Sequence, residues 1–536
     1  MGDIFESYSS TFGIRIGGIL NILLSIPGNH KILGFSGVDV LSAGSYSDSS
    51  TILGRGGNDT LYGLYGKDRI LGGDGDDMIS GGPGLGDYLF GEAGNDTIAG
   101  DGGGGGGDGA DHIYGGSGDD HLMGDGGADT LVGGDRFGNS PNDGNDILEG
   151  GDGDDFLAGG GGNDALYGGN GRDIFQYTVG EEISTSPGLA DTLSGGADTD
   201  RIKLQGSGVF DFRPATISGI EEVQLYKDAS VLFSSDQILG GINSFFGSIG
   251  KDIVEIYGET SADYSGLIFS NWGADDQIIL NGSDVIGTSL NDIFRLTGNA
   301  HVEGGSGRDI FEVDSIVEAS FIDGGLDVDT LNLRSILSIG ANIDLSSGIW
   351  GSVILSIGTI SNVENVIGTQ ANDSISGNSV DNGLAGLAGN DYLFGGEGSD
   401  SLNGGTGNDR LDGGAGSDTV IGGRGRDVLT GGADEDKFVF TSEADSRVGS
   451  SRDLIIDFLQ LTDRLDISSI DAVAGGSDDS FVFLGETSFS GTAGELVYRV
   501  GATRTVVSVD TDGDAIADFE IGLSGQIAIT ATDFIL

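Results

Sequence analysis

The sequence predicts an all-β chain in which a parallel β-solenoid, or β-roll, is followed by a β-rich C-terminal domain. Three observations predict this class. A nine-residue unit, Gly-Gly-x-Gly-x-Asp-x-U-x with U aliphatic or aromatic, recurs in register; the 105 glycines among 536 residues include those at fixed slots of this unit; and each unit offers one apolar residue. One inward residue per unit suits stacked coils better than a closed globular core.

The most regular array runs from Gly386 to Phe440. Its acid slot is filled by Asp391, Asp400, Asp409, Asp418, Asp427 and Asp436, and its U slot by Leu393, Leu402, Leu411, Val420, Leu429 and Phe438. We expect six residues of each unit to form a turn and three to form a short strand. Two units then make one coil of eighteen residues with two parallel strands facing each other.

A longer array begins at Gly54. Its acid slot is filled by Asp59, Asp68, Asp77, Asp87, Asp96, Asp111, Asp120, Asp129, Asp146, Asp155, Asp164 and Asp173. The spacing of nine is interrupted around Gly102–Gly107 and around Phe137–Asp143. A solenoid tolerates such insertions because they extend from one edge of a turn and leave the stack intact.

The stretch between the arrays is a degenerate version of them. Residues 304–313, which include Asp309, nearly repeat 168–177, and residues 366–375 resemble 285–293. The segment 178–376 is therefore predicted to continue the β-solenoid with irregular coils and a richer apolar core. A separate β-sandwich is the alternative for this segment.

The chain is accordingly divided into five segments. Residues 1–52 are expected to form an N-terminal cap or assembly segment, and 53–177 the first β-roll; 178–376 form the degenerate middle domain, 377–440 the second β-roll, and 441–536 the C-terminal β domain. Residues 1–10 lack the basic residues of a secretory leader. The apolar stretch at 14–26 is too short for a transmembrane segment, so we read it as structure or as a means of attachment.

The charge balance indicates the class of partner. The chain has 85 acidic and 24 basic residues, which give a formal net charge of −61. Nucleic acid and anionic membrane would repel such a chain, whereas cations would bind it. The chain has no cysteine, so disulfides and thiolate metal sites are excluded.

The aspartate slots predict a metal. Equivalent acids of successive coils would lie about 4.8 Å apart, the spacing of paired strands. At an effective dielectric constant of about 20, each such pair would repel by about 3–4 kcal/mol. A donor set made only of oxygen favours several Ca²⁺ ions over Mg²⁺, which requires a tight octahedron. We therefore predict that all the acid-slot aspartates named above, with Asp309, are calcium ligands.

Two other metal sites can be considered. Zinc would require converging histidine ligands, but His112 and His121 are expected on opposite walls of a coil. Residues Asp510, Asp512 and Asp514 resemble the start of an EF-hand loop, although Ala515 stands in its glycine slot and Ile521 in place of its final glutamate. An isolated calcium turn and a solvated acidic hairpin both remain open there.

The two arrays resemble the β-rolls of RTX (repeats-in-toxin) proteins, whose nonapeptides bind calcium. Residues 441–536 resemble the C-terminal domain of serralysin-type secreted metalloproteases at 463–468, 489–496, 510–521 and 533–536. This resemblance implies export through the type I secretion machinery of a Gram-negative bacterium, guided by an uncleaved C-terminal signal.

The chain departs from the serralysins in its catalytic motifs. The sequence contains no zinc-binding H-E-x-x-H, no G-x-S-x-G and no P-loop. We therefore expect no enzymatic activity, with a divergent active site in 178–376 as the minor alternative.

The function expected is that of a secreted calcium-binding structural protein. It would fold on export in external calcium and self-associate at the cell surface into an S-layer, filament or matrix. The main alternative is a calcium-dependent adhesin or glycan-binding protein with cell-surface polysaccharide as a partner. In that reading Tyr264, Trp272 and Trp350 are exposed and stack on sugars.

Overall fold

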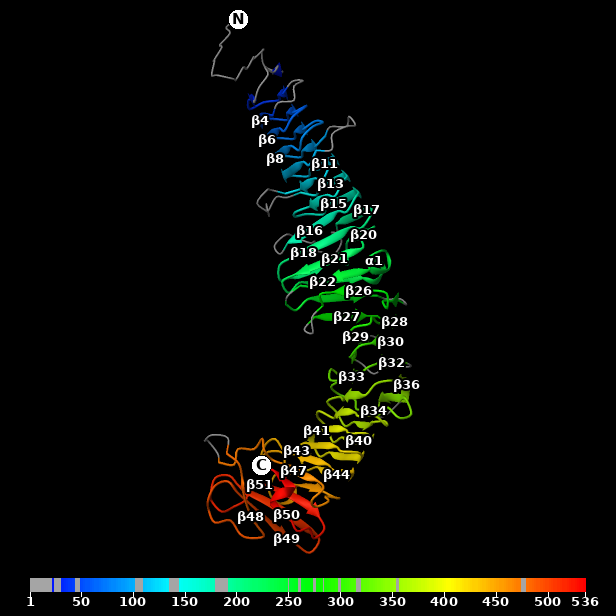
Figure 1. Ribbon diagram of the computed structural model, residues 1–536, viewed down its shortest axis with the longest axis vertical. Helices are drawn as coiled ribbons and strands as arrows, with labels where there is room; N and C mark the ends of the chain where they lie inside the picture. Colours follow the sequence, from blue (N-terminus) through cyan, green and yellow to red (C-terminus); the bar gives the residue numbers. More distant parts are fainter. Residues whose placement is uncertain are drawn as a thin grey trace. The chain divides into compact units, whose positions relative to one another are not determined.

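The computed structural model describes residues 22–23, 30–43, 49–101, 109–134, 144–178, 191–248, 250–258, 262–272, 276–282, 284–296, 300–314, 320–352, 356–473 and 479–536. The chain divides into two compact units, which we describe separately (Figure 1). Unit 1 comprises 1–258 and 266–278, and unit 2 comprises 259–265 and 279–536. The predicted role of the apolar stretch at 14–26 falls almost wholly outside the described residues.

Unit 1 is built from short strands that stack in parallel sheets. The first sheet contains β1 (Ile22–Leu23), β3 (Val40–Ser42), β5 (Thr60–Tyr62), β7 (Met78–Ser80), β9 (Thr97–Ala99), β11 (His121–Gly126), β13 (Ile147–Asp152), β15 (Ala165–Asn170), β17 (Thr192–Ala197) and β20 (Thr216–Ser218). The second contains β2 (His30–Leu33), β4 (Ser50–Gly56), β6 (Arg69–Asp74), β8 (Tyr88–Ala93), β10 (His112–Ser117), β12 (Thr130–Val132), β14 (Phe156–Ala158), β16 (Ile174–Thr178), β18 (Arg201–Gln205), β21 (Glu222–Tyr226), β23 (Ser244–Phe246) and β26 (Ile268–Ser270).

The predicted coil of eighteen residues is confirmed. Thr51 of β4 pairs with Arg69 of β6, and Thr60 of β5 pairs with Met78 of β7, each eighteen residues on. Successive nonapeptides therefore alternate between the two sheets. The middle residue of each short strand points inward and is fully buried, as Leu61 and Ile70 illustrate. This single apolar row forms the thin core that the sequence pattern predicts.

The later part of unit 1 has a thicker core. Strands β19 (Val209–Asp211), β22 (Ser230–Ser234) and β24 (Ile253–Tyr257) pair in parallel beside it. The Phe212 and Phe233 rings stack 5.4 Å apart, and Phe245 packs edge-on against Phe233. A short helix, α1 (Ser235–Leu239), which the sequence analysis did not anticipate, begins with a capping box between Ser234 and Gln237.

Unit 2 contains two further runs of strands. One consists of β29 (Asp292–Leu296), β31 (Ile310–Val313), β33 (Thr330–Asn332), β37 (Asn365–Ile367), β39 (Gly383–Ala385), β41 (Ser401–Gly407), β43 (Thr419–Gly425), β45 (Lys437–Val439), β47 (Arg464–Asp466) and β52 (Phe534–Ile535). The other consists of β25 (Ala262–Asp263), β28 (Asp284–Ile286), β30 (His301–Ser306), β32 (Phe321–Leu326), β36 (Ser356–Ser361), β35 (Ile349–Ser352), β34 (Ala341–Asp344), β38 (Ser374–Ser376), β40 (Tyr392–Glu397), β42 (Arg410–Ala415), β44 (Val428–Ala433), β46 (Asp453–Ile455), β51 (Phe519–Ser524), β50 (Arg504–Asp510), β49 (Glu495–Val500) and β48 (Val482–Gly485). Strand β27 (Gln277–Asn281) crosses the division between the units, and two 3₁₀ turns cover Gly449–Ser451 and Ala531–Asp533.

The regular coil of unit 2 is interrupted by insertions, one of which lies between β33 and β37. Thr330 pairs with Asn365, 35 residues on, whereas Thr419 pairs with Lys437, 18 residues on. The additional residues form β34 and β35, which pair antiparallel with each other, and β35 also pairs antiparallel with β36. Other described strands within 191–376 pair in parallel, as a solenoid rather than a β-sandwich would.

The C-terminal end of unit 2 changes to antiparallel pairing. Strand β46 continues the roll and pairs in parallel with β51, which pairs antiparallel with β50, and β50 with β49. The chain is thus almost entirely β-structure, as predicted. Within the residues that can be described, no helix has the length and apolarity needed to cross a bilayer.

Glycine is favoured at the second slot of the repeat because the backbone turns left-handed there. Gly414 has φ +109°, and a Cβ at this position would collide with the carbonyl oxygen of Gly396 in the previous coil. Leu387 occupies the same slot with φ +74°. A non-glycine residue in this region is strained by about 1–2 kcal/mol, so Leu387 marks an irregular coil of the second array.

The thin core predicts that substitutions at two neighbouring residues of β44 have very different effects on the free energy of unfolding. Leu429 is fully buried, whereas Thr430 points outward. In calcium, we expect Leu429→Ala to lower the free energy of unfolding by about 2–5 kcal/mol, and Thr430→Ala to change it by less than about 0.5 kcal/mol. Denaturant titration followed by circular dichroism measures both. Equal effects of the two substitutions would contradict an inward row of single apolar residues.

Candidate metal centre

Aspartates of the first array form a ladder along one edge of unit 1. The backbone N–H of Asp59 donates to Asp77 Oδ1 at 2.7 Å, and the N–H of Asp77 donates to Asp96 Oδ1 at 2.7 Å. The same bond recurs from coil to coil. This ladder contains Asp39, Asp59, Asp77, Asp96, Asp120, Asp146, Asp164 and Asp191.

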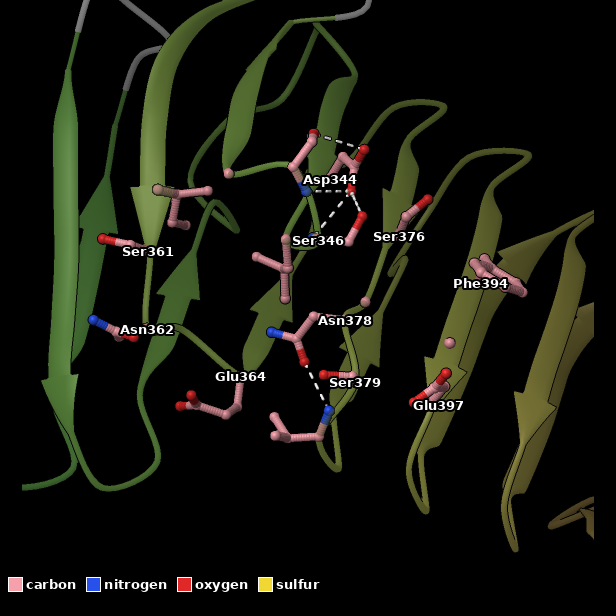
Figure 2. A pocket seen from close by; sticks show the side chains of 17 residues that line it. Asp344, Ser346, Ser361, Asn362, Glu364, Ser376, Asn378, Ser379, Phe394 and Glu397 are labelled. Carbon is pink, nitrogen blue, oxygen red and sulfur yellow. Dashed lines mark hydrogen bonds between the residues drawn. The ribbon is translucent and has the colours of Figure 1, made fainter.

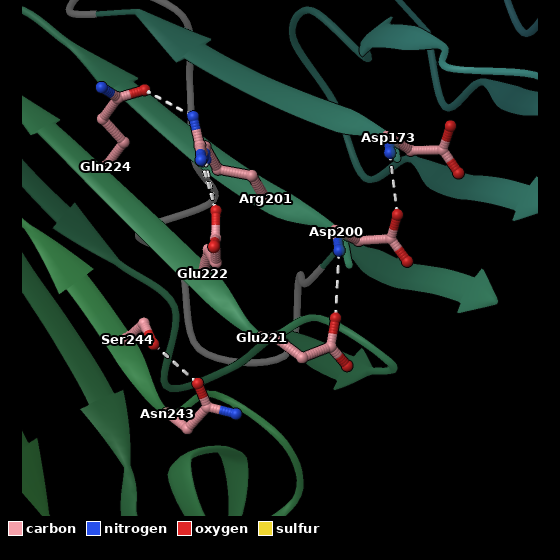
Figure 3. A network of polar contacts seen from close by, with 8 residues as sticks. All are labelled: Asp173, Asp200, Arg201, Glu221, Glu222, Gln224, Asn243 and Ser244. Carbon is pink, nitrogen blue, oxygen red and sulfur yellow. Dashed lines mark hydrogen bonds and ion pairs between the residues drawn. The ribbon is translucent and has the colours of Figure 1, made fainter. Parts of the chain in front are cut away.

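The alternate aspartates form a second ladder along the other edge of unit 1. It contains Asp68, Asp87, Asp111, Asp129, Asp155, Asp173 and Asp200. Figure 3 shows its last members: the N–H of Asp173 donates to Asp200 Oδ1 at 2.8 Å, and that of Asp200 donates to Glu221 Oε2 at 3.0 Å. A longer side chain thus replaces aspartate where this ladder ends.

Unit 2 repeats the arrangement. One ladder contains Asp373, Asp391, Asp409, Asp427 and Asp453, and another contains Asp400, Asp418, Asp436 and Asp463. A shorter one contains Asp292, Asp309 and Asp329. It also ends at a glutamate, because the N–H of Asp329 donates to Glu364 Oε2 at 2.8 Å.

The ladder bond occupies one carboxylate oxygen of each aspartate and leaves the other buried. Oδ2 is enclosed and has no hydrogen-bond partner in Asp59, Asp68, Asp77, Asp96, Asp111, Asp129, Asp155, Asp173, Asp200, Asp309, Asp329, Asp391, Asp400, Asp409, Asp418, Asp427, Asp436 and Asp453. An ionised oxygen without a partner in such a position is strongly unfavourable. Because a buried Oδ2 without a partner recurs in coil after coil, we infer that these oxygens are ligands for cations.

The first glycine of each repeat forms a cradle around this oxygen. A Cβ built on Gly404 would lie 2.5 Å from Asp409 Oδ2 and 2.6 Å from the carbonyl oxygen of Gly422 in the next coil. A Cβ built on Gly54 would likewise lie 2.5 Å from both Asp59 Oδ2 and the Gly72 carbonyl oxygen. A carboxylate and a carbonyl therefore border one small space that any side chain at the glycine would fill. Such donors suit Ca²⁺, which accepts flexible sets of oxygen ligands.

The raised pKa values of the ladder aspartates also favour binding of a cation. Burial, followed by the nearby carboxylates, raises the pKa of Asp87, Asp96 and Asp129 from 3.8 to about 8. In unit 2 the pKa of Asp309 rises to about 8 and that of Asp453 to about 9, with burial again the main cause. Without metal, these groups hold protons near neutral pH. A divalent ion in the cradle would replace the protons and favour the carboxylates.

Every aspartate predicted from the repeat lies in one of these ladders, and none is more than 3% exposed. Their assignment as ligands stays a prediction. Asp200, Asp329 and Asp453 share the buried Oδ2 but are not among the predicted ligands. Asp200 lies nine residues after Asp191, and Asp329 ends a complete Gly-Gly-x-x-x-Asp unit, so the repeat pattern could have identified both. Asp453 follows the segment 441–452, which does not contain the Gly-Gly-x-Gly pattern of the repeat, and no local pattern identifies it.

The loop that resembles an EF-hand connects β50 with β51. Carboxylate oxygens of Asp510, Asp512 and Asp514 lie within 4.8 Å of one another. Asp510 is fully buried, but its two oxygens accept the N–H groups of Gly513 and Ala515 at 2.7 and 2.9 Å. These bonds stabilise the turn itself, and both the isolated calcium turn and the acidic hairpin stay predictions.

The two neighbouring histidines do not form a common site. His112 and His121 lie on strands of different sheets, β10 and β11. The His121 Nε2 atom pairs with Glu149 at 2.8 Å, and the His112 ring packs against Tyr88 with centroids 4.7 Å apart. This arrangement offers zinc no convergent ligand set.

The fold and the cradles define a calcium-binding β-roll, and family comparisons agree. The RTX calcium-binding nonapeptide repeat (4 copies) family matches residues 53–84, 86–104, 105–135 and 141–175, and the peptidase M10 serralysin C terminal family matches residues 331–536. The chain therefore carries RTX repeats that bind several Ca²⁺ ions and a serralysin-type C-terminal domain. These features indicate an extracellular protein exported by type I secretion from a Gram-negative bacterium.

Individual relatives match smaller parts of the chain. The metallopeptidase AprA of Pseudomonas marginalis is 35% identical over 95 residues, which are 17% of this chain and 18% of that protein. The chain thus spans about a fifth of the length of this relative.

Solved structures also match in part. Two subunits of the mannuronan C5-epimerase of Azotobacter vinelandii, AlgE6R3 and AlgE6R2, are 26% and 34% identical; they cover 31% and 30% of this chain and 78% and 92% of their own, each with a TM-score of 0.20. The extracellular lipase LipA of Serratia marcescens is 16% identical over 58% of this chain and 67% of its own, with a TM-score of 0.15.

The raised pKa values predict opposite effects of pH with and without calcium. A carboxyl group whose folded pKa is raised stabilises the fold below its unfolded pKa near 4, and this contribution is lost as pH rises through the folded pKa of about 6–8. In EDTA, acidification from pH 8 to pH 4 should therefore increase β-structure. With calcium, acidification through the same window should weaken calcium binding. Circular dichroism and calcium titration measure the two trends, and parallel trends would contradict the assignment.

The cradle can be tested without removing a carboxylate. Gly404 does not have a left-handed backbone, so alanine is compatible with its conformation, but the added Cβ would meet Asp409 Oδ2 and the Gly422 carbonyl. We expect Gly404→Ala to reduce the number of bound calcium ions and to raise the calcium concentration at the midpoint of folding. The control is Thr406→Ala, an exposed residue of the same turn. Unchanged calcium stoichiometry in Gly404→Ala would show that the ion lies elsewhere.

Proposed function

We propose that this protein is a secreted, non-enzymatic structural protein that folds on export in external calcium. It then assembles at the cell surface as part of an S-layer, filament or matrix. The observation that carries this proposal is the extent of the aspartate ladders, which run through both units. Most of the described residues thus belong to coils whose stability is expected to depend on calcium.

The export step follows from the same energetics. Calcium-binding modules of extracellular proteins work at about 10⁻⁴–10⁻³ M calcium, a level that the cytosol does not reach. With buried carboxylates lacking a partner, the coils are unstable there, and the chain stays unfolded and competent for secretion. Outside the cell, metal binding supplies the folding free energy. Because each ladder bond joins one coil to the next, folding should be cooperative along the stack.

Charge supports a role for calcium in assembly as well. A net charge of −61 opposes contact between copies of the chain. Bound calcium ions lower this charge together with the repulsion it causes. Self-association is therefore expected only in the calcium-loaded protein.

The adhesin alternative depended on exposed aromatic residues, and the burial of two of them argues against it. Tyr264 and Trp350 are only 1% exposed, so the expectation that they form a sugar-stacking surface is wrong. Both rings belong to the core, as is usual for large aromatic residues in a solenoid. Trp272 is half-buried and packs edge-on against Phe269, with ring centroids 4.9 Å apart.

The proposal is tested by following folding and assembly in parallel. Calcium added to the EDTA-treated chain should produce a cooperative rise in β-structure by circular dichroism. Electron microscopy of the same samples should then show sheets or fibres, and magnesium at equal concentration should produce neither. A β-rich spectrum that EDTA leaves unchanged would refute the folding step. Discrete calcium-loaded monomers at high protein concentration would refute the assembly step.

A further inference from the structure

A polar cleft of about 960 Å³ opens in unit 2 beside the insertion that interrupts the regular coil (Figure 2). Strands β34 and β35 enter the sheet between β36 and β38, so the sheet is locally wider than in the arrays. The turns that follow β34, β36 and β38, together with the end of β40, border the opening. The cleft is thus formed by an irregularity that calcium binding does not require.

Three neighbouring strands form the floor of the cleft. Asp344 of β34 pairs in register with Ser376 of β38, and Ser376 pairs with Phe394 of β40. All three side chains lie on the outward face, since the residues before them, such as Ile375 and Leu393, are buried. Phe394 is 36% exposed and presents its ring to the cleft. An aromatic ring beside a carboxylate and a hydroxyl is suited to a ligand that has both an apolar face and hydroxyl groups.

The rim of the cleft is polar and acidic. Glu364 and Asn362 lie at the side of β36, and Glu397 lies at the side of β40 (Figure 2). Among the residues that line the cleft there is no lysine, arginine or histidine. Phosphates, uronates and nucleic acids would be repelled, whereas sugar hydroxyl or amino groups would find acceptors.

Several polar groups of the cleft are held in place before any ligand arrives. Asp344 Oδ1 accepts the Ser346 N–H at 3.0 Å, and Asp344 Oδ2 accepts the Ser347 hydroxyl at 2.7 Å. Asn378 Oδ1 accepts the Val380 N–H at 3.0 Å. Glu364 is held by its bond to the N–H of Asp329. A pre-organised site loses less conformational entropy when a flexible ligand binds.

We propose that this cleft binds a neutral or amino-substituted oligosaccharide. One sugar ring lies against Phe394, while hydroxyl or amino groups of this ring and of neighbouring sugar units donate to Asp344, Glu364 and Glu397. The volume of the cleft falls in the range of about 300–1,000 Å³ typical of small-molecule sites. The cleft lies within one chain, so sugar binding does not require assembly. An experiment can therefore disprove sugar binding without disproving assembly, and the reverse.

The strand that carries Phe394 also provides a matched control. Tyr392 lies two residues earlier on β40, points to the same side of the sheet and is 38% exposed, but it does not line the cleft. Phe394→Ala should therefore remove the stacking surface, and Tyr392→Ala should remove an aromatic ring of similar exposure without affecting the site. Both side chains are largely outside the core, so both variants should fold in calcium.

The experiment is isothermal titration of the calcium-loaded full chain with cellohexaose, maltohexaose, a chitosan hexamer and hexagalacturonate. We expect binding of at least one neutral or amino sugar, at least tenfold weaker binding in Phe394→Ala, and unchanged binding in Tyr392→Ala. Glu397→Gln should weaken binding of the chitosan hexamer more than that of a neutral sugar.

Three results would overturn the proposal: no binding of the neutral and amino sugars, equal losses in the two aromatic variants, or a preference for hexagalacturonate. Circular dichroism in calcium verifies that each variant is folded. Electron microscopy of the variants separates loss of sugar binding from loss of assembly.

Discussion

The structure depends on one repeated arrangement, an aspartate whose Oδ1 bonds to the preceding coil while its Oδ2 points into a glycine cradle. The bond between the Asp391 N–H and Asp409 Oδ1, at 2.8 Å, links two coils, and Asp409 Oδ2 lies buried without a hydrogen-bond partner. A neutral hydrogen-bonding group could have made the ladder alone. Indeed, Asn382 takes this place in one coil: its side-chain amide Nδ2 donates to the Glu364 carbonyl of the preceding coil at 2.8 Å, and its backbone N–H donates to Asp400 Oδ1. The second oxygen of aspartate is useful only when a cation binds it.

This arrangement explains why the rest of the coil can be so simple. Each short strand buries one apolar side chain, such as Leu402 or Leu411, and the turns are rich in glycine. Such a chain has little hydrophobic surface to offset the entropy of ordering glycines. Folding therefore becomes conditional on calcium. Where the core thickens, as around Phe212, Phe233 and Phe245, the regular ladders give way to irregular coils.

The insertion at β34–β36 shows how a regular scaffold can acquire a binding surface. On one edge the ladder continues across the insertion because the Asp329 N–H donates to Glu364. On the other edge the Ala341 N–H donates to Asp373 Oδ1, and the Asp373 N–H donates to Asp391 Oδ1. The insertion therefore changes the outward face without breaking the stack. A rigid scaffold with a local irregularity is a common way to place binding residues.

The sequence by itself determined the coil, its inward row and its metal chemistry, because these properties depend only on a repeat of nine and on residue types at fixed slots. Leu393 and Asp391 illustrate this, since their burial follows directly from their slots. Only the tertiary structure could show that Asp453 continues the ladder of Asp427 after an insertion, or that Trp350 is buried. The cleft at Phe394 likewise depends on the entry of β34 and β35 into the sheet between β36 and β38, and a local pattern carries no information about that strand order.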